Sequence, residues 1–348
     1  MRNNFRKYGD MRVRFETPEE RAGIIRILEE QRGFQIDEDL KRLTKIHPYD
    51  TRTFDFNLKF KTYNYCIRPF IGAAMMSSGV RFYSAQEFFR VAELEFKVVP
   101  RFPVFHIPHD GWEFPEELME SVCIPQDLFM KYHEEMRDTD INLAVPDAYR
   151  GGDMCHTFRI SRMLCDVERF IGPEEIMEQY GMGFCYEKVW DGTVIKHVTE
   201  TVKEKTLAHY RKHHEWMDGI CNRHPRLLLF DMHSYSDRIV PADFLRNGCQ
   251  TPDLCIGTDD RFTPPKLTEI VRNRFTEAGF SIGFNDPYAG CYIPNTILSG
   301  ESTTDLVAIM LEFHKRTYCD QNGQSVPEKL KKIEHIVRQI VVDCVDLD

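Results

Sequence analysis

Short apolar runs alternate with amphipathic segments over most of the chain, from about residue 100 onward. The runs at 103–107, 226–230 and 306–311 are typical of short buried strands. Residues at helical spacing mark the segment 201–221, namely Leu207, Tyr210, His214 and Met217. A last helix is predicted to begin at the capping pair Ser325 and Glu328, with the apolar stripe Leu330, Ile333, Ile336, Val337 and Ile340. Strands alternating with helices predict an α/β domain of three layers, α/β/α, around a mostly parallel mixed sheet.

The first 95 residues have a different pattern. Thr17 and Glu20 form a capping box that predicts a helix, and Ser84 and Glu87 form a second one. Between them, aromatic-rich alternation at 54–65 predicts strands. This region holds no polar cluster with catalytic spacing. We therefore expect a small accessory α+β extension at residues 1–95 and a catalytic domain at 96–348.

Composition narrows the class of protein. Hydrophobic residues make up 42% and charged residues 29% of the chain, which is typical of a globular fold. The net charge of -10 argues against a nucleic-acid partner, which normally meets a basic face. No apolar run approaches the roughly 20 residues that cross a membrane, and the N-terminus lacks the apolar stretch of a signal peptide. The eleven cysteines include no C-x-x-C pair, which favours reduced thiols and a cytoplasmic location.

Two histidines stand where an α/β sheet places its ligands. His109 and His233 each follow a predicted strand, and ligands bind outside the carboxyl ends of such strands. A catalytic zinc ion takes three protein ligands, so a carboxylate is needed beside two imidazoles. Asp138 and Asp140 both offer one. Four other histidines are explained by exposure on helical faces: His209, His213, His214 and His335.

Several segments together, in their order and spacing, resemble the N-formylglutamate amidohydrolase family over residues 100–320. They are Ile107-Pro108-His109-Asp110-Gly111 with Phe114-Pro115, Asp138-Thr139-Asp140, Ser161-Arg162 through Asp166-Val167-Glu168-Arg169, Gly181-Met182-Gly183, Asp231-Met232-His233-Ser234-Tyr235, Pro252-Asp253-Leu254-Cys255-Ile256-Gly257-Thr258, Asn285-Asp286-Pro287-Tyr288-Ala289-Gly290 and Leu311-Glu312. The resemblance implies a fold similar to that of zinc carboxypeptidases and one zinc ion as cofactor. Two departures bear on the substrate: Asp110 replaces the usual serine, and Glu168 replaces the usual asparagine.

The resemblance also implies a set of metal ligands, namely His109, His233 and an acidic residue. Asp140 is the favoured third ligand and Asp138 the alternative. The carboxypeptidase pattern of a glutamate three residues after the first histidine is absent, because Trp112 stands there and Glu113 comes one position later.

Glu312 is implied as the general base that takes a proton from the attacking water and passes it to the leaving nitrogen. Its position after an apolar run makes an unused charge costly there, although a surface carboxylate at a strand end is the other interpretation. Arg162 and Arg169 are expected to bind substrate carboxylate, or else to pair with Asp166 and Glu168. Three residues are expected in a substrate loop, which is also a good turn sequence: Asn285, Tyr288 and Gly290.

These expectations describe an enzyme that hydrolyses a small N-acyl amide bearing a carboxylate. The leading substrate is N-formyl-L-glutamate, which would give formate and glutamate. One alternative is a deacylase or carboxypeptidase acting on another N-acyl amino acid or peptide. The other is a non-catalytic binding module on the same fold. The partner in either enzyme is a small molecule, with no nucleic acid and no membrane.

Overall fold

The computed structural model divides the chain into two compact units, residues 1–99 and 100–347. It describes residues 100–239, 250–345 and 347 in full, and within the first unit the backbone of four strands. The predicted helices after Thr17 and Ser84 lie outside these described residues.

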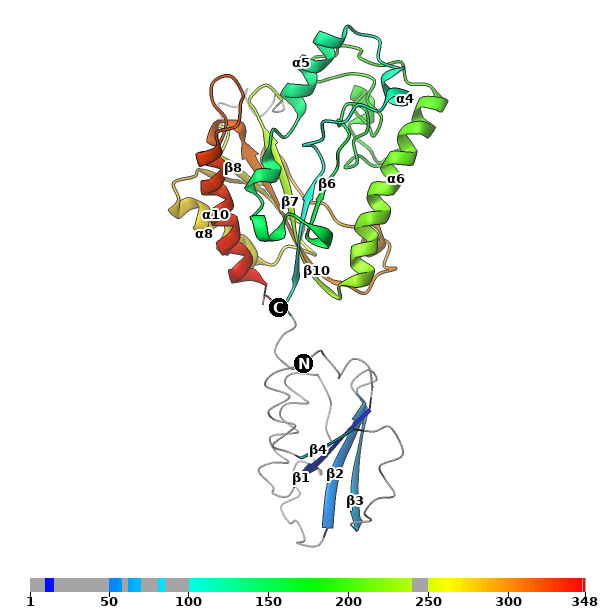
Figure 1. Ribbon diagram of the computed structural model, residues 1–348, viewed down its shortest axis with the longest axis vertical. Helices are drawn as coiled ribbons and strands as arrows, with labels where there is room; N and C mark the ends of the chain where they lie inside the picture. Colours follow the sequence, from blue (N-terminus) through cyan, green and yellow to red (C-terminus); the bar gives the residue numbers. More distant parts are fainter. Residues whose placement is uncertain are drawn as a thin grey trace. The chain divides into compact units, whose positions relative to one another are not determined.

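The first unit contains a four-stranded sheet (Figure 1). Its strands are β1 (Asp10–Phe15), β2 (Asp50–Asn57), β3 (Thr62–Pro69) and β4 (Arg81–Ser84). They lie in the order β3-β2-β1-β4, with β1 antiparallel to β2, β2 antiparallel to β3, and β1 parallel to β4. The alternating stretch at 54–65 therefore does form strands, as predicted.

The second unit is built on a six-stranded mixed sheet in the order β6-β5-β7-β10-β8-β9. The strands are β5 (Phe102–Ile107), β6 (Cys155–Thr157), β7 (Arg226–Tyr235), β8 (Leu254–Gly257), β9 (Ile282–Phe284) and β10 (Asp305–His314). Every neighbouring pair is parallel except β10 and β8. The predicted mostly parallel mixed sheet is confirmed.

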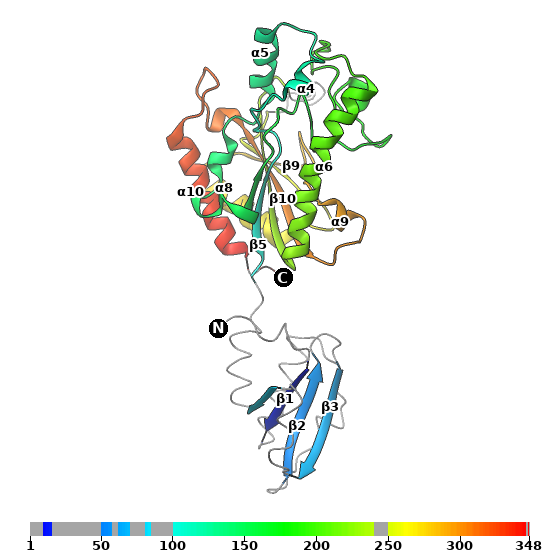
Figure 2. The same cartoon turned by 45° about the vertical axis from the view of Figure 1, so that its right-hand side comes forward.

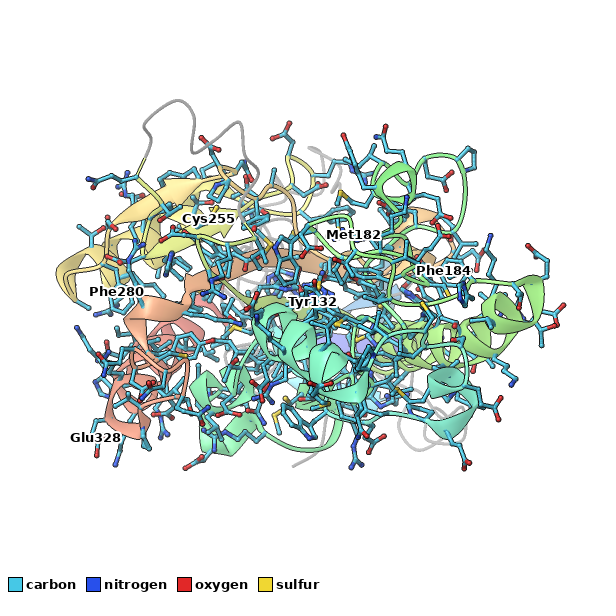
Figure 3. The ribbon with its side chains drawn as sticks, turned by 90° about the horizontal axis from the view of Figure 1, so that it is seen from above. Tyr132, Met182, Phe184, Cys255, Phe280 and Glu328 are labelled. Carbon is cyan, nitrogen blue, oxygen red and sulfur yellow. The ribbon has the colours of Figure 1, made fainter. Side chains whose placement is uncertain are left out.

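Helices cover both faces of this sheet, which gives three layers (Figures 1 and 2). The helices are α4 (Glu116–Met119), α5 (Gln126–Met136), α6 (Glu200–Arg223), α8 (Pro265–Glu277), α9 (Asn295–Leu298) and α10 (Pro327–Cys344). Seen from above, α8 and α10, near Phe280 and Glu328, lie to one side and α6 to the other, with Tyr132 of α5 between them (Figure 3). None of the helices in the described parts of the chain is long and apolar enough to span a membrane.

Side chains that alternate along the strands form the two apolar interfaces of the sheet. On one face, Phe230 of β7 and Ile309 of β10 pack with α8 and α10. On the other face, Leu229 of β7 and Ala308 of β10 pack with Met217 of α6. Both faces are buried, which explains why the strands read as continuous apolar runs rather than as alternating ones.

Two predicted boundaries differ from the structure. The strand β7 continues through Tyr235, so His233 lies inside a strand rather than after it. The helix α10 begins at Pro327 without a side-chain cap, because the hydroxyl of Ser325 donates to Asp140 instead, at 2.6 Å. The stripe predicted for this helix is buried as expected.

A third apolar cluster lies outside the sheet and consists mainly of irregular chain between residues 158 and 195. It is closed by side chains of α4 and α5, such as Leu118 and Phe129. Lys196 is fully buried there, and its ammonium donates to the carbonyls of Met163 and Leu164 at 3.2 Å each. These bonds stabilise the turn that carries Arg162 and Asp166.

Candidate metal centre and active site

The sheet face that meets α6 changes from apolar to polar toward the carboxyl ends of its parallel strands. Along β7, Leu229 is followed on the same face by Asp231 and then His233. On β10, Glu312 is the direct neighbour of His233 across the two strands. His233 and Glu312 are both buried. The pleat of the sheet therefore brings a histidine and a carboxylate together beyond the end of the apolar layer.

The loop after β5 brings His109 to the same carboxyl-terminal end of the sheet. The backbone N–H of Asp138 donates to the carbonyl of His109 at 3.0 Å, which ties the two loops together. The carboxylate of Asp110 accepts from Arg137 and from the backbone of Asp140, both at 3.0 Å. Asp110 thus shapes the loop that presents Asp138. Burial raises its pKa to about 7, against the opposing charge of Arg137.

His109 has a ring nitrogen that is free for a ligand. Its Nε2 lies 2.9 Å from the carboxylate of Asp166, which can only accept, so the ring proton is on Nε2. Its Nδ1 is buried, has no hydrogen-bond partner, and lies 3.8 Å from Asp138 Oδ2. Burial and the charge of Arg162 lower the pKa of His109, which favours the neutral ring. A neutral imidazole with an unshared lone pair facing a carboxylate is suited to a metal ion.

His233 meets the same carboxylate oxygen from the other side. Its Nδ1 lies 3.2 Å from Asp138 Oδ2, while its Nε2 lies 3.1 Å from Asp231. Burial opposes a charge on this ring, but Glu168, Asp231 and Asp138 outweigh it and hold the pKa of His233 well above the usual range. The surrounding carboxylates therefore favour a positive charge at this point. Metal-bound histidines commonly donate their second N–H to a carboxylate, as both rings can here.

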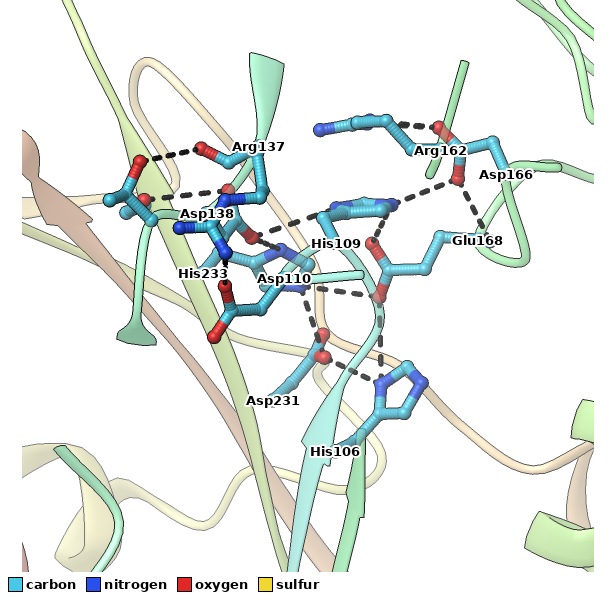
Figure 4. A network of polar contacts seen from close by, with 12 residues as sticks. His106, His109, Asp110, Arg137, Asp138, Arg162, Asp166, Glu168, Asp231 and His233 are labelled. Atoms are coloured by element: carbon cyan, nitrogen blue, oxygen red, sulfur yellow. Dashed lines mark hydrogen bonds and ion pairs between the residues drawn. The ribbon is translucent and has the colours of Figure 1, made fainter. Parts of the chain in front are cut away.

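Glu168 is a further carboxylate, on the Nε2 side of both rings (Figure 4). It lies 3.2 Å from His233 Nε2 and 3.6 Å from His109 Nε2, so His109, Glu168 and His233 also have spacing compatible with a metal ion. These two nitrogens already have the partners Asp231 and Asp166, however. The buried atom without a partner is Nδ1 of His109, and it faces Asp138. Among the described residues, the groups whose ligand atoms lie close enough together for one metal ion are His109, Glu168 and His233, and His106, Glu168 and Asp231. Asp138 is a further candidate because it lies against Nδ1 of both His109 and His233.

Asp166 connects the histidines to the two arginines. It is fully buried and accepts hydrogen bonds from Arg162 at 2.9 Å and from Tyr186 at 2.8 Å. Burial raises its pKa, but the charges of Arg162, His109 and Arg169 outweigh this effect and keep the pKa well below its ordinary value. Arg169 lies farther off, with Nε 3.6 Å from Asp166, and that Nε is buried without a hydrogen-bond partner.

Glu312 has the properties of a proton acceptor in a closed site. Burial raises its pKa to about 8, with the positive charge of His233 opposing and the charge of Asp138 adding to the effect. A dication beside it would lower this pKa and favour the ionised form, which accepts a proton. Carboxylates whose pKa is shifted in this way are typical of general bases.

Asp140 is not where the sequence pattern led us to expect it. Its carboxylate lies 3.0 Å from Arg137 and 2.6 Å from the hydroxyl of Ser325, away from the two imidazoles. The reason is its backbone, since a φ of 55° turns the chain at Asp140 as the 3₁₀ helix Ile141–Ala144 begins. Asp138, which was the alternative, is the aspartate placed between His109 and His233.

The expected substrate loop is ordered mainly by its own contacts. Asn285 Oδ1 accepts from the backbone of Thr258 at 2.8 Å and from Gly290 at 3.3 Å, so it shapes the turn. The hydroxyl of Tyr288 donates to the carbonyl of Ile239 at 3.1 Å. Burial, together with the charge of Glu312, raises the pKa of Tyr288. Of the three predicted residues, Tyr288 is the one whose environment includes the catalytic candidate Glu312.

Sequence reasoning assigned no role to Asp231 and His106, and it misjudged two histidines. His106 Nδ1 lies 2.8 Å from Asp231. His213 and His214 were expected to be exposed on α6, yet both are buried against this network. The signal was present, because both positions fall on the stripe of α6 that also carries Met217.

The sequence and the fold of the second unit are similar to those of known proteins. The N-formylglutamate amidohydrolase family matches residues 103–319. A solved structure described as N-formylglutamate amidohydrolase from Ralstonia eutropha JMP134 has 18% identity and a TM-score of 0.54, over 71% of this chain and 96% of that one. The gene product Atu2144 from Agrobacterium tumefaciens has 15% identity and a TM-score of 0.48, over 70% of this chain and 89% of that one. No curated sequence matches the chain. With the family pattern spanning most of the second unit, the chain belongs to the N-formylglutamate amidohydrolase family.

Proposed function

We propose that the chain is a zinc-dependent amidohydrolase whose leading substrate is N-formyl-L-glutamate. The observation that carries the proposal is the buried lone pair of His109 Nδ1, which faces Asp138 beside His233. In this proposal those three residues hold one divalent metal ion. When bound there, zinc supplies Lewis-acid chemistry, polarising the amide carbonyl and lowering the pKa of water from about 15.7 to about 7.

The protein's own groups carry the remaining steps. Glu312 accepts the proton of the attacking water and delivers it to the leaving nitrogen. Glu312 is buried, and the exclusion of bulk water around it strengthens each electrostatic contact in the site. Arg169 is the better candidate to hold the substrate carboxylate, because its Nε lacks a partner, whereas Arg162 is committed to Asp166. Tyr288 and the turn formed by Asn285 and Gly290 are proposed to line the substrate side.

A second candidate substrate is an N-acyl amino acid other than N-formylglutamate. The observation that favours it is Glu168, whose carboxylate lies 3.6 Å from Nε2 of His109, the same nitrogen that meets Asp166, the partner of Arg162 (Figure 4). A negative charge there opposes the binding of a substrate with two carboxylates. The family membership supports hydrolysis of an amide bond in either case.

Hydrolysis of a substrate panel by the zinc-loaded chain tests the proposal. The panel contains N-formyl-L-glutamate, N-formyl-L-glutamine and N-acetyl-L-glutamate, with Glu312→Gln as the inactive control. We expect N-formyl-L-glutamate to give the highest kcat/KM, and Arg169→Met to remove its advantage over the neutral glutamine analogue. Faster cleavage of another N-acyl compound would favour the second candidate. Absence of any zinc-dependent turnover would reject both.

A further inference from the structure

Three polar residues lie side by side across neighbouring strands, on the sheet face that meets α6. His156 of β6 and His106 of β5 are register partners, and His106 is also the partner of Asp231 on β7. His213 of α6 bridges the first two. Its Nδ1 lies 3.0 Å from His156 Nε2, and its Nε2 lies 3.2 Å from His106 Nε2. With the 2.8 Å contact from His106 Nδ1 to Asp231, a continuous hydrogen-bonded chain reaches the partner of His233.

Asp231 determines the direction of this chain. Its Oδ1 meets ring nitrogens of both His106 and His233, and its Oδ2 meets a backbone N–H, so this carboxylate is the acceptor among three donor groups. His106 Nδ1 therefore donates to it. The backbone N–H of Tyr292 donates to the second oxygen of Asp231 at 2.8 Å. Both oxygens are thus engaged, which fixes the orientation of the carboxylate that faces His233.

The two outer histidines each carry a single proton. Burial lowers the pKa of His156 to about 3. Burial holds the pKa of His213 well below its usual value. With one proton on each ring, His106 Nε2 accepts from His213 Nε2, and His213 Nδ1 accepts from His156 Nε2. Each of the three ring N–H groups, on His156, His213 and His106, then points along the hydrogen bonds toward Asp231.

Aromatic contacts hold these rings in place. His156 stacks on Trp216 with centroids 4.1 Å apart, and Phe158 meets His213 edge-on at 5.4 Å. Tyr292 covers His106 at 4.2 Å. Ring rotation is therefore opposed by packing on several sides, and the hydrogen-bond geometry does not depend on one contact.

We propose that His156 and His213 are positioning residues, which set the ring tautomer of His106 and through Asp231 hold His233 in its metal-binding orientation. His156 and His213 themselves belong to neither group of residues with metal-compatible spacing. This positioning role rests on the proposed function only in that His233 binds the metal. The tautomers of the three histidines do not require a bound metal.

Long-range ¹H–¹⁵N correlation NMR of the full, metal-free chain with ¹⁵N-labelled histidine reads the tautomers directly. We expect a proton on Nδ1 alone for His106 and on Nε2 alone for both His213 and His156, with assignments made by single substitution. A doubly protonated His106, or His213 protonated at Nδ1, would overturn the proposal. This readout is independent of metal and of turnover, so an inactive chain with the expected tautomers would reject the proposed function and leave this inference standing.

Matched variants at one position test the link to the metal site. His213→Leu removes both ring nitrogens, whereas His213→Gln keeps an N–H donor at the position of Nε2. Competition between the protein and a chelating dye for Zn²⁺ gives the dissociation constant. Loss of such outer contacts typically weakens metal binding by about 10-fold or more, so we expect about a tenfold weakening for Leu and a value close to wild type for Gln. Equal weakening by both substitutions, or none by either, would contradict the positioning role.

Discussion

At the scale of single residues, Asp138 and Asp140 are the two aspartates considered as the third ligand of the proposed metal ion. Asp138 and Asp140 are two positions apart in one loop, yet only Asp138 is buried between the imidazoles. We expect Asp138→Asn to reduce bound zinc to near zero, because a neutral amide is a poor ligand beside a buried pair of histidines. Asp140→Asn is the matched control and should keep about one zinc per chain. Elemental analysis after dialysis against zinc measures both, and the reverse pattern would reassign the ligand to Asp140.

Glu312 is expected to serve turnover without binding the metal. Glu312→Gln keeps the shape of the side chain and removes the proton acceptor, so kcat should fall by at least about 10²-fold. Zinc content and thermal stability should stay near those of the wild type, since the carboxylate has no ligand role in the proposal. A variant with more than about a tenth of wild-type kcat would rule out a general base, for which the loss is at least about 10²-fold. A loss of zinc with activity would instead make Glu312 a ligand.

The sequence could indicate these residues only in part, and the reason is physical. His109, His233 and Glu312 follow or end apolar runs, where the rule for parallel sheets predicts a site. The spacing of Asp138 and Asp140 carries no such information, because a loop has no fixed period. The left-handed backbone at Asp140, which turns its carboxylate toward Arg137, becomes visible only in three dimensions.

At the scale of elements, the active site depends on how closely two loops approach each other. A Cβ on Gly111 would lie 2.4 Å from the carbonyl oxygen of Ile160, which is backbone and cannot move aside alone. The N–H of Glu113 donates to the carbonyl of Arg159 at 2.7 Å, which ties the loop of His109 to the segment leading to Arg162. The absence of a side chain at Gly111 is thus what allows His109 and Asp166 to meet.

We expect Gly111→Ala to separate these loops and weaken both stability and zinc binding. Overpacking of this kind typically costs about 1–3 kcal/mol of unfolding free energy. Gly151→Ala is the control, since a Cβ there meets nothing within 4 Å. Urea unfolding followed by circular dichroism gives the free energies, and zinc titration gives the affinities. If the two variants behave alike, the close approach at Gly111 does not support the site.

The elements themselves were more predictable than their contacts. The buried strands β5, β7 and β10 and the helix α6 follow directly from apolar periodicity, although β7 extends beyond its apolar run into Asp231 and His233. Polar residues on α6 suggested exposure, and this was wrong for His213 and His214. Their burial depends on partners from β5 and β6 and from the segment that carries Tyr292, and helical periodicity alone does not reveal these partners.

At the scale of the whole molecule, the beginning and the end of the second unit are bonded to each other at the amino ends of the central strands, opposite to the candidate site. Arg101, which precedes β5, donates through Nε to the carbonyl of Leu347 at 2.7 Å, and its guanidinium pairs with Asp305 at 3.0 Å. The guanidinium of Arg226, at the start of β7, donates to the same carbonyl at 2.8 Å. The beginning and the end of residues 100–347 are therefore joined at the amino ends of β5, β7 and β10, while the metal-binding candidates lie at the carboxyl ends.

This closure predicts that residues 96–348 fold and bind metal without the first unit. The second unit has its own apolar interfaces on both faces of its sheet. No described residue of the candidate site comes from residues 1–99. We expect the shortened chain to unfold cooperatively in urea, to bind one zinc ion, and to lose that ion when Asp138→Asn is added as the control. Comparison of kcat/KM with the full chain then isolates what residues 1–95 contribute. A shortened chain that fails to unfold cooperatively, or that folds but no longer binds zinc, would show that the first unit is part of the catalytic domain rather than an accessory to it.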